Sequence, residues 1–75
     1  MPHKSLHKRL HNSIWNAHWN KQPALVVELA RQYLAHHPQD ATVWLSLRHA
    51  LTRLSRYEEA EQALSVELVA EFETL

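Results

Sequence analysis

The chain has 75 residues, of which 45% are hydrophobic, with no Gly, no Cys and a formal net charge of zero. A chain of this length forms at most one domain and buries only about 60% of the surface that its unfolded form exposes. The absence of Gly excludes Gly-rich phosphate loops and disfavours β-hairpins, and the absence of Cys excludes disulfides and thiolate metal sites. We therefore expect an all-α protein. We also expect a cytoplasmic one, because a chain without Cys suits a reducing compartment.

Charge is distributed unevenly along the sequence. Residues 1–40 carry five basic and two acidic side chains, a net charge of +3, and residues 41–75 carry three basic and six acidic ones, a net charge of −3. Opposite charges on the two halves favour head-to-tail association, although such an asymmetry is more often that of a solvated surface. No apolar run approaches the roughly 20 residues of a membrane span. The basic, acid-free segment 2–21 has a weak likeness to a mitochondrial transit peptide, but its His and Trp residues are unusual for one.

Apolar periodicity predicts two helices in the first half of the chain. The first is expected over residues 4–20, where Trp15 and Trp19 fall nearly opposite the main apolar stripe. The second is expected over residues 23–36, because Pro23 suits a first helical turn and Pro38 ends a helix. The two apolar stripes consist of Leu6, Leu10, Ile14 and Ala17 in the first helix, and of Val26, Leu29, Ala30, Tyr33 and Leu34 in the second.

Two more helices are predicted in the second half. Asp40 is expected to cap the third helix, and the sequence from Ser55 to Glu58 is expected to form a capping box that starts a fourth helix at about Arg56. The stripe of the third helix is Trp44, Leu47, Leu51 and Leu54. The fourth helix has one stripe of Tyr57, Ala60, Leu64, Leu68, Phe72 and Leu75 and a second of Ala63, Val66 and Ala70.

The last two predicted helices carry the spacing of a known repeat. Trp44, Leu47 and Leu51 match its first-helix signature, and Tyr57, Glu59, Ala60 and Leu64 match its second helix. This stretch resembles a tetratricopeptide repeat. A shift of 34 residues places the apolar positions of this stretch over those of the first half, so residues 7–40 look like a degenerate first repeat and residues 41–74 like a second. Arg48 and Glu67 depart from the pattern, because the family has small residues at both positions.

The resemblance implies a fold and a class of function. We expect a single tetratricopeptide-like domain over residues 1–75, a four-helix fragment of an α-solenoid built from antiparallel helix-turn-helix repeats. Members of the family bind peptides on a concave face lined by the first helix of each repeat. The residues that correspond to this face are Lys8, His11, Asn12, Trp15, His18, Trp19, Leu45, Arg48, His49, Thr52 and Arg53.

The residue types on that face support the same function. Aromatic anchors flanked by cations suit a peptide with apolar and acidic groups. The expected function is therefore a non-catalytic interaction module that binds a protein or peptide. In an alternative interpretation, Trp15 and Trp19 pack against an N-terminal extension or a second copy of the chain.

The last helix suggests a second role. Repeat arrays normally need about three units, because each repeat buries its apolar face on its neighbour. We therefore expect either self-association through the last helix or a place at the start of a longer solenoid. The residues expected to mediate self-association are Val66, Leu68, Val69, Phe72 and Leu75.

Other chemistry has little support in the sequence. His3, His7, His11 and His18 share one side of the first helix, but no Cys or nearby carboxylate completes a four-ligand metal site. We expect solvated His, no metal and no cofactor. No hydroxyl lies in a nucleophile turn, so we predict no catalytic residue. Four cations among residues 1–21 are a weak footprint for nucleic acid, and we expect no such partner.

Overall fold

The computed structural model describes the backbone of residues 2–73 and the side chains of residues 8–72. The described chain consists of four α-helices without a strand, and the prediction of an all-α fold is confirmed. The helices are α1 (Pro2–Trp19), α2 (Pro23–His36), α3 (Ala41–Arg53) and α4 (Tyr57–Glu73). Pro23 opens α2, as predicted, and the chain leaves α2 just before Pro38.

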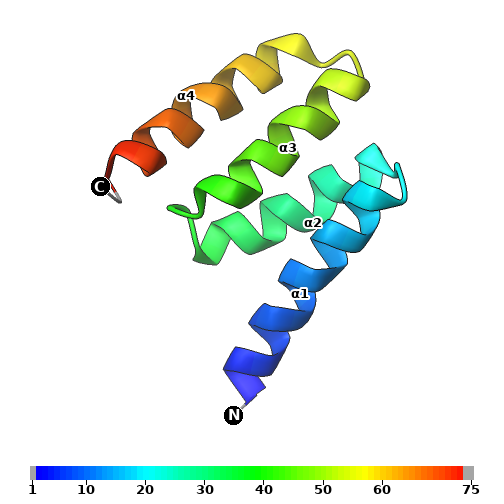
Figure 1. Ribbon diagram of the computed structural model, residues 1–75, viewed down its shortest axis with the longest axis vertical. Helices are drawn as coiled ribbons and strands as arrows, with labels where there is room; N and C mark the ends of the chain where they lie inside the picture. Colours follow the sequence, from blue (N-terminus) through cyan, green and yellow to red (C-terminus); the bar gives the residue numbers. More distant parts are fainter. Residues whose placement is uncertain (1, 74–75) are drawn as a thin grey trace.

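The helices form an open, staggered stack (Figure 1). Each helix packs against the next along the chain, and α1 also contacts α3. Within the described residues, α1 and α4 do not pack against each other, and the backbone of α4 lies beside that of α3 alone. The molecule measures 38 × 31 × 17 Å.

The core lies along the contacts of α2 and α3 with their neighbours. Its largest fully buried apolar side chains are Ile14, Val26, Val43 and Leu51. The predicted stripes of α1, α2 and α3 face this core, with Leu10, Leu29, Trp44 and Leu54 only partly buried. Leu6 lies outside the described side chains.

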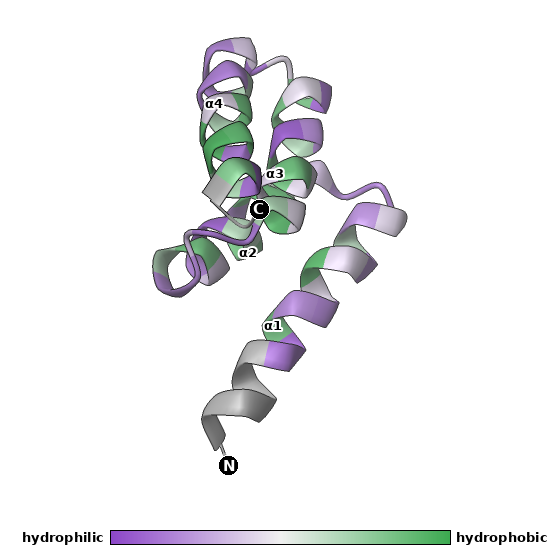
Figure 2. Cartoon of the chain, turned by 60° about the vertical axis from the view of Figure 1, so that its left-hand side comes forward, coloured by the Kyte–Doolittle hydropathy of each residue, from purple (hydrophilic) through white to green (hydrophobic). Residues whose placement is uncertain are grey.

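The packing of α4 differs from the prediction. The buried residues of this helix are Ala60, Ala63, Glu67 and Ala70, whereas Leu64, Leu68 and Phe72 remain exposed. The reason is that three alanines at helical spacing let the backbone of α4 approach α3 closely and leave the large apolar side chains on the flanks. Figure 2 shows the green, hydrophobic residues of α4 beside α3 and the more polar α1 extending away from them.

The turns after α1 and α3 have the same hydrogen-bond pattern. In each turn, the backbone N–H of the third residue after the helix donates to the carbonyl of the residue five positions earlier. The N–H of the second residue after the helix donates to the carbonyl of the residue three positions earlier. The bonds join Gln22 to Ala17 (2.9 Å) and Lys21 to His18 (3.2 Å) after α1, and Arg56 to Leu51 (2.9 Å) and Ser55 to Thr52 (3.0 Å) after α3.

The capping box predicted from Ser55 to Glu58 is wrong. Ser55 has φ 60° because it closes α3 in the left-handed conformation, whereas an N-cap residue is normally extended. Helix α4 begins at Tyr57, and Arg56 side-chain nitrogens bond Glu59 in its first turn.

The helix boundaries repeat with a fixed offset. Trp19 and Arg53 end α1 and α3, Pro23 and Tyr57 begin α2 and α4, and each pair is 34 residues apart. Among the described residues, the two with positive φ are also 34 apart, with φ 57° at Lys21 and 60° at Ser55. The two halves of the chain therefore make the same turn at equivalent positions, although the residues in the turn differ.

Glycine at these two turn positions is expected to stabilise the fold. A left-handed conformation costs a residue with a Cβ atom roughly 1 kcal/mol, and glycine adopts it without this cost. Lys21→Gly and Ser55→Gly should each raise the free energy of unfolding by about 0.5 kcal/mol, or the melting temperature by about 2–4 °C. Thermal unfolding followed by circular dichroism measures this shift. Gln22→Gly is the control, because Gln22 has φ −114° and should only lose stability. A loss in all three variants would contradict the turn geometry.

Candidate functional site

A row of aromatic rings crosses from α1 to α3. The ring centroids of His11 and Trp15 are 6.2 Å apart, those of Trp15 and His18 are 5.3 Å apart, and those of His18 and His49 are 6.3 Å apart. Trp19 extends the row, with its ring 5.3 Å from that of His18. We call the surface formed by these five residues the aromatic face.

Helical spacing and one polar contact position this face. Residues three and four apart lie on the same side of a helix, which aligns His11, Trp15 and His18 along α1. The Trp15 Nε1–H donates to His11 Nε2 at 3.4 Å. His18 Nδ1 lies 3.3 Å from the hydroxyl of Ser46, a buried residue of α3. This contact links the two helices and sets His18 beside His49.

The surroundings of the aromatic face are basic. Lys21 and Arg53 line a shallow hollow together with His18 and His49, where the end of α3 meets the α1–α2 turn. Lys8 and Asn12 are exposed on α1, a helix without an acidic residue. Sequence reasoning did not place Lys21 in the site. Its proximity to Arg53 follows from the turn geometry, in which Lys21 takes the left-handed position.

Not every predicted residue belongs to this surface. The Arg48 Nε–H donates at 2.9 Å to the carboxylate of Glu67, so Arg48 serves the contact between α3 and α4. Thr52 is exposed, but its hydroxyl donates to the carbonyl of Arg48 within the same helix at 2.9 Å. Leu45 is half-buried. The contribution of α3 to the aromatic face is therefore His49, with Arg53 at its margin.

A polar cluster closes the end of the aromatic face near His11. The Tyr33 hydroxyl donates to Asp40 Oδ2 at 2.7 Å, and Asp40 Oδ1 accepts from the backbone N–H of Val43 at 3.3 Å, which confirms the predicted N-cap. His11 Nε2 lies 4.0 Å from Asp40 Oδ2, and the His11 ring is 5.5 Å from that of Tyr33. Burial, together with the bond to Asp40, raises the pKa of Tyr33 above its ordinary value. The cluster fixes the ends of α2 and α3 against α1.

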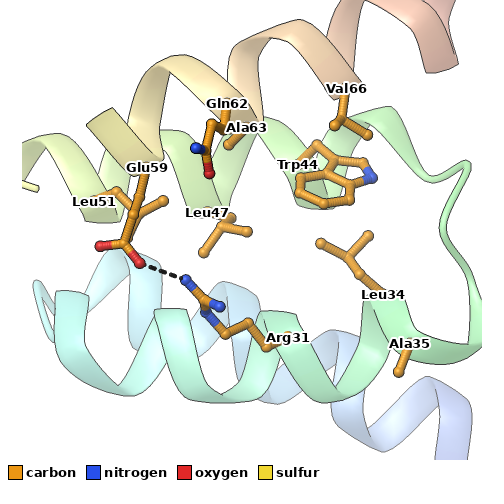
Figure 3. A pocket seen from close by; sticks show the side chains of 10 residues that line it. All are labelled: Arg31, Leu34, Ala35, Trp44, Leu47, Leu51, Glu59, Gln62, Ala63 and Val66. Carbon is orange, nitrogen blue, oxygen red and sulfur yellow. Dashed lines mark hydrogen bonds and ion pairs between the residues drawn. The ribbon is translucent and has the colours of Figure 1, made fainter. Parts of the chain in front are cut away.

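The structure also contains a groove that the sequence did not predict. It lies between α2 and α4, along α3, and has a volume of about 460 Å³ (Figure 3). None of its lining residues belongs to the aromatic face. Arg31 Nη2 pairs with Glu59 Oε1 at 3.0 Å at one end, and the Trp44 ring lies at the other. Hydrogen bonds and charge from Arg56 and Arg31 lower the pKa of Glu59. The Trp44 Nε1–H is held by the carbonyl of Pro38 at 2.8 Å.

The residues predicted for self-association divide between two surfaces. Val66 lines the groove between α2 and α4. Leu68, Val69 and Phe72 are exposed elsewhere on α4. Leu75 lies outside the described residues.

The all-α fold is established by the four helices of the described chain. Comparisons with family models, curated proteins and solved structures give no significant match for this chain. What the chain binds is therefore inferred from its own surfaces.

Two features are absent from the described part of the chain. In that part, no three or more His, Cys, Asp or Glu side chains come together in a way that could hold a metal ion. His3 and His7, two members of the predicted His row, lie outside the described side chains. Residues 2–73 form no helix with the length and apolar character needed to cross a membrane.

Proposed function

We propose that this chain is a non-catalytic protein–protein interaction module that binds a peptide segment of a partner on the aromatic face. The observation that carries the proposal is the continuous row of rings from His11 to His49, which joins α1 to α3 and ends at the exposed Trp19. Large rigid aromatic side chains provide contact area at low entropic cost and are enriched among the residues that dominate binding.

The internal repeat supports the same proposal. The 34-residue offset in helix ends, helix starts and positive-φ turn residues is what two tetratricopeptide-like repeats, over residues 7–40 and 41–74, would produce. In that arrangement α1 and α3 are the first helices of the two repeats. The aromatic face is then the surface on which the proteins that this chain resembles bind their peptides.

The charge of the aromatic face defines the expected partner. Lys21 and Arg53 lie beside His18 and His49, and Lys8 is exposed on α1. The Asp40 carboxylate at the far end is already bonded to Tyr33 and Val43. A partner peptide with carboxylates beside apolar side chains would find both cations and rings. We therefore expect an acidic and apolar segment.

Binding of selected peptides tests the proposal. Peptides that bind the full chain are selected from a random displayed library, and their dissociation constants are measured by fluorescence anisotropy. The selected sequences should combine Asp or Glu with Leu or aromatic residues. Trp19→Ala should weaken their binding at least tenfold, because an exposed aromatic anchor carries about 2 kcal/mol. Arg53→Glu should also weaken peptide binding, and by a larger factor at low salt than at high salt.

The control for Trp19→Ala is Phe72→Ala. The two side chains are 74% and 77% exposed, but Phe72 lies on α4 and away from the aromatic face. Phe72→Ala should leave peptide binding unchanged. Peptides that bind equally well to the Trp19→Ala variant, or that lose affinity only with Phe72→Ala, would contradict the proposal.

Self-association through α4 is the second candidate. The observation in its favour is the exposure of Leu68, Val69 and Phe72, which together leave apolar surface in contact with water. Sedimentation equilibrium distinguishes the two candidates, because only self-association predicts a mass that rises with protein concentration.

A further inference from the structure

Helices α2 and α4 occupy equivalent positions in the two halves but have different neighbours. Helix α2 lies between α1 and α3, whereas the backbone of α4 lies beside α3 alone. The difference appears in equivalent side chains. Ala30 and Leu34 of α2 are 0% and 6% exposed, and Leu64 and Leu68, 34 residues later on α4, are 38% and 55% exposed. The flank of α2 that is buried beneath its neighbours therefore remains open on α4.

The open flank of α4 has a defined composition. Tyr57, Leu64, Leu68 and Phe72 follow one another at spacings of seven, four and four residues and are all exposed. We call this stripe the α4 edge. Glu61 lies in the same stripe, between Tyr57 and Leu64, where the equivalent residue of α2 is the buried Val27. The α4 edge is thus apolar with exposed carboxylates along it, Glu61 near its start and Glu71, seven residues after Leu64, near its end.

Two pairings with a second copy of the chain suit this edge poorly, one through its α4 and one through the side of α1 that corresponds to the buried side of α3. Helix α4 has no Lys, Arg or His, so a second α4 would bring no cation to the exposed Glu61 of this edge. Helix α1 of a second copy lacks the apolar side that α3 buries. The α3 residues Val43, Leu47 and Ala50 are buried, and the α1 residues 34 positions earlier, Arg9, Ser13 and Asn16, are polar and exposed.

We propose that the α4 edge binds one amphipathic helix of a partner protein. The apolar side of that helix resembles the side of α3 that packs on α2, and a Lys or Arg lies opposite Glu61. The apolar contact is based on the α2–α3 packing within this chain, and the charge follows from the exposed Glu61 on a helix without Lys, Arg or His. This surface is separate from the aromatic face, so the two partners are independent.

Two synthetic peptides probe the α4 edge. Both have the sequence of residues 40–54, which contains α3, and differ only at Thr42 and Thr52, which are exposed in the chain. One carries Lys at both positions and the other carries Glu. The basic peptide should bind the full chain at least tenfold more tightly than the acidic peptide. Leu64→Asp and Leu68→Asp should each weaken binding of the basic peptide at least tenfold. Glu61→Lys should reverse the preference of the chain for the basic peptide over the acidic one.

Controls separate this surface from the aromatic face and from self-association. Trp19→Ala should leave binding of the basic peptide unchanged, and circular dichroism should show that the variants of the exposed leucines remain folded. Equal binding of the basic peptide to Leu64→Asp, to Leu68→Asp and to the original chain would overturn the proposal. A concentration-dependent dimer that Leu68→Asp dissociates would also overturn it, because the occupant would then be a second copy.

Discussion

Arg48→Ala is expected to lower the free energy of unfolding by about 2–3 kcal/mol. The Glu67 side chain is 7% exposed, and its carboxylate accepts from Arg48 Nε at 2.9 Å between α3 and α4. Removing the guanidinium would leave a buried carboxylate without its ion-pair partner, which costs about 3–5 kcal/mol for a fully buried pair. The expected loss is smaller because the Arg48 side chain is 27% exposed and water would partly replace it.

The double variant Arg48→Ala with Glu67→Ala shows why the two residues occur together. Each of these two charged side chains compensates for the other in the contact between α3 and α4. The double variant should be within about 1 kcal/mol of the original chain, because neither charge remains buried. Urea unfolding of the two single variants and the double variant completes a double-mutant cycle. Losses that simply add would show that the ion pair does not couple α3 to α4.

Asp40→Ala is expected to lower the free energy of unfolding by about 2–3 kcal/mol as well. The carboxylate of Asp40 caps α3 through the Val43 N–H and accepts from the Tyr33 hydroxyl at 2.7 Å. Loss of an N-cap costs about 1 kcal/mol, and loss of the hydrogen bond from Tyr33 to a carboxylate costs about 1.5 kcal/mol. Chemical unfolding measures the sum of both effects.

Tyr33→Phe isolates the second effect and adds a dependence on pH. This variant keeps the cap on α3 and should lose only about 1 kcal/mol. Because the pKa of Tyr33 is raised in the folded state, its protonated form stabilises the fold fully below the ordinary tyrosine pKa of about 10. This stability is lost as the pH rises above that value. The original chain should therefore lose more stability than Tyr33→Phe between about pH 9 and pH 11, and equal losses would contradict the burial of this hydroxyl.

Most of the fold could be predicted from local sequence. Pro23 and Asp40 start α2 and α3 because a fixed φ and a side-chain acceptor act within a few residues. The prediction at Ser55 was wrong, because the sequence from Ser55 to Glu58 fits a capping box but Ser55 closes the preceding helix. The side of α4 that packs was also not predictable from hydrophobicity. The alanines of α4 pack against α3 because their small side chains allow the two helices to approach closely, and the larger Leu64 and Leu68 remain exposed.

The candidate site was predicted in part. The helical spacing of His11, Trp15 and His18 was sufficient to place them on one side of α1. Their approach to His49 depends on how α1 packs beside α3, which only the structure provides. The role of Arg48 also required the structure, because its partner Glu67 lies on another helix 19 residues away.

The indole N–H signals of the three Trp residues test the central claim most directly. Each gives one resolved peak in a proton–nitrogen correlation spectrum, and Trp44 is the internal reference because its N–H is held by the Pro38 carbonyl. On addition of a selected acidic and apolar peptide, the signals of Trp15 and Trp19 should shift together with the amide of His49, while the signal of Trp44 stays in place. Shifts confined to Trp44 or to the amides of α4 would contradict binding on the aromatic face.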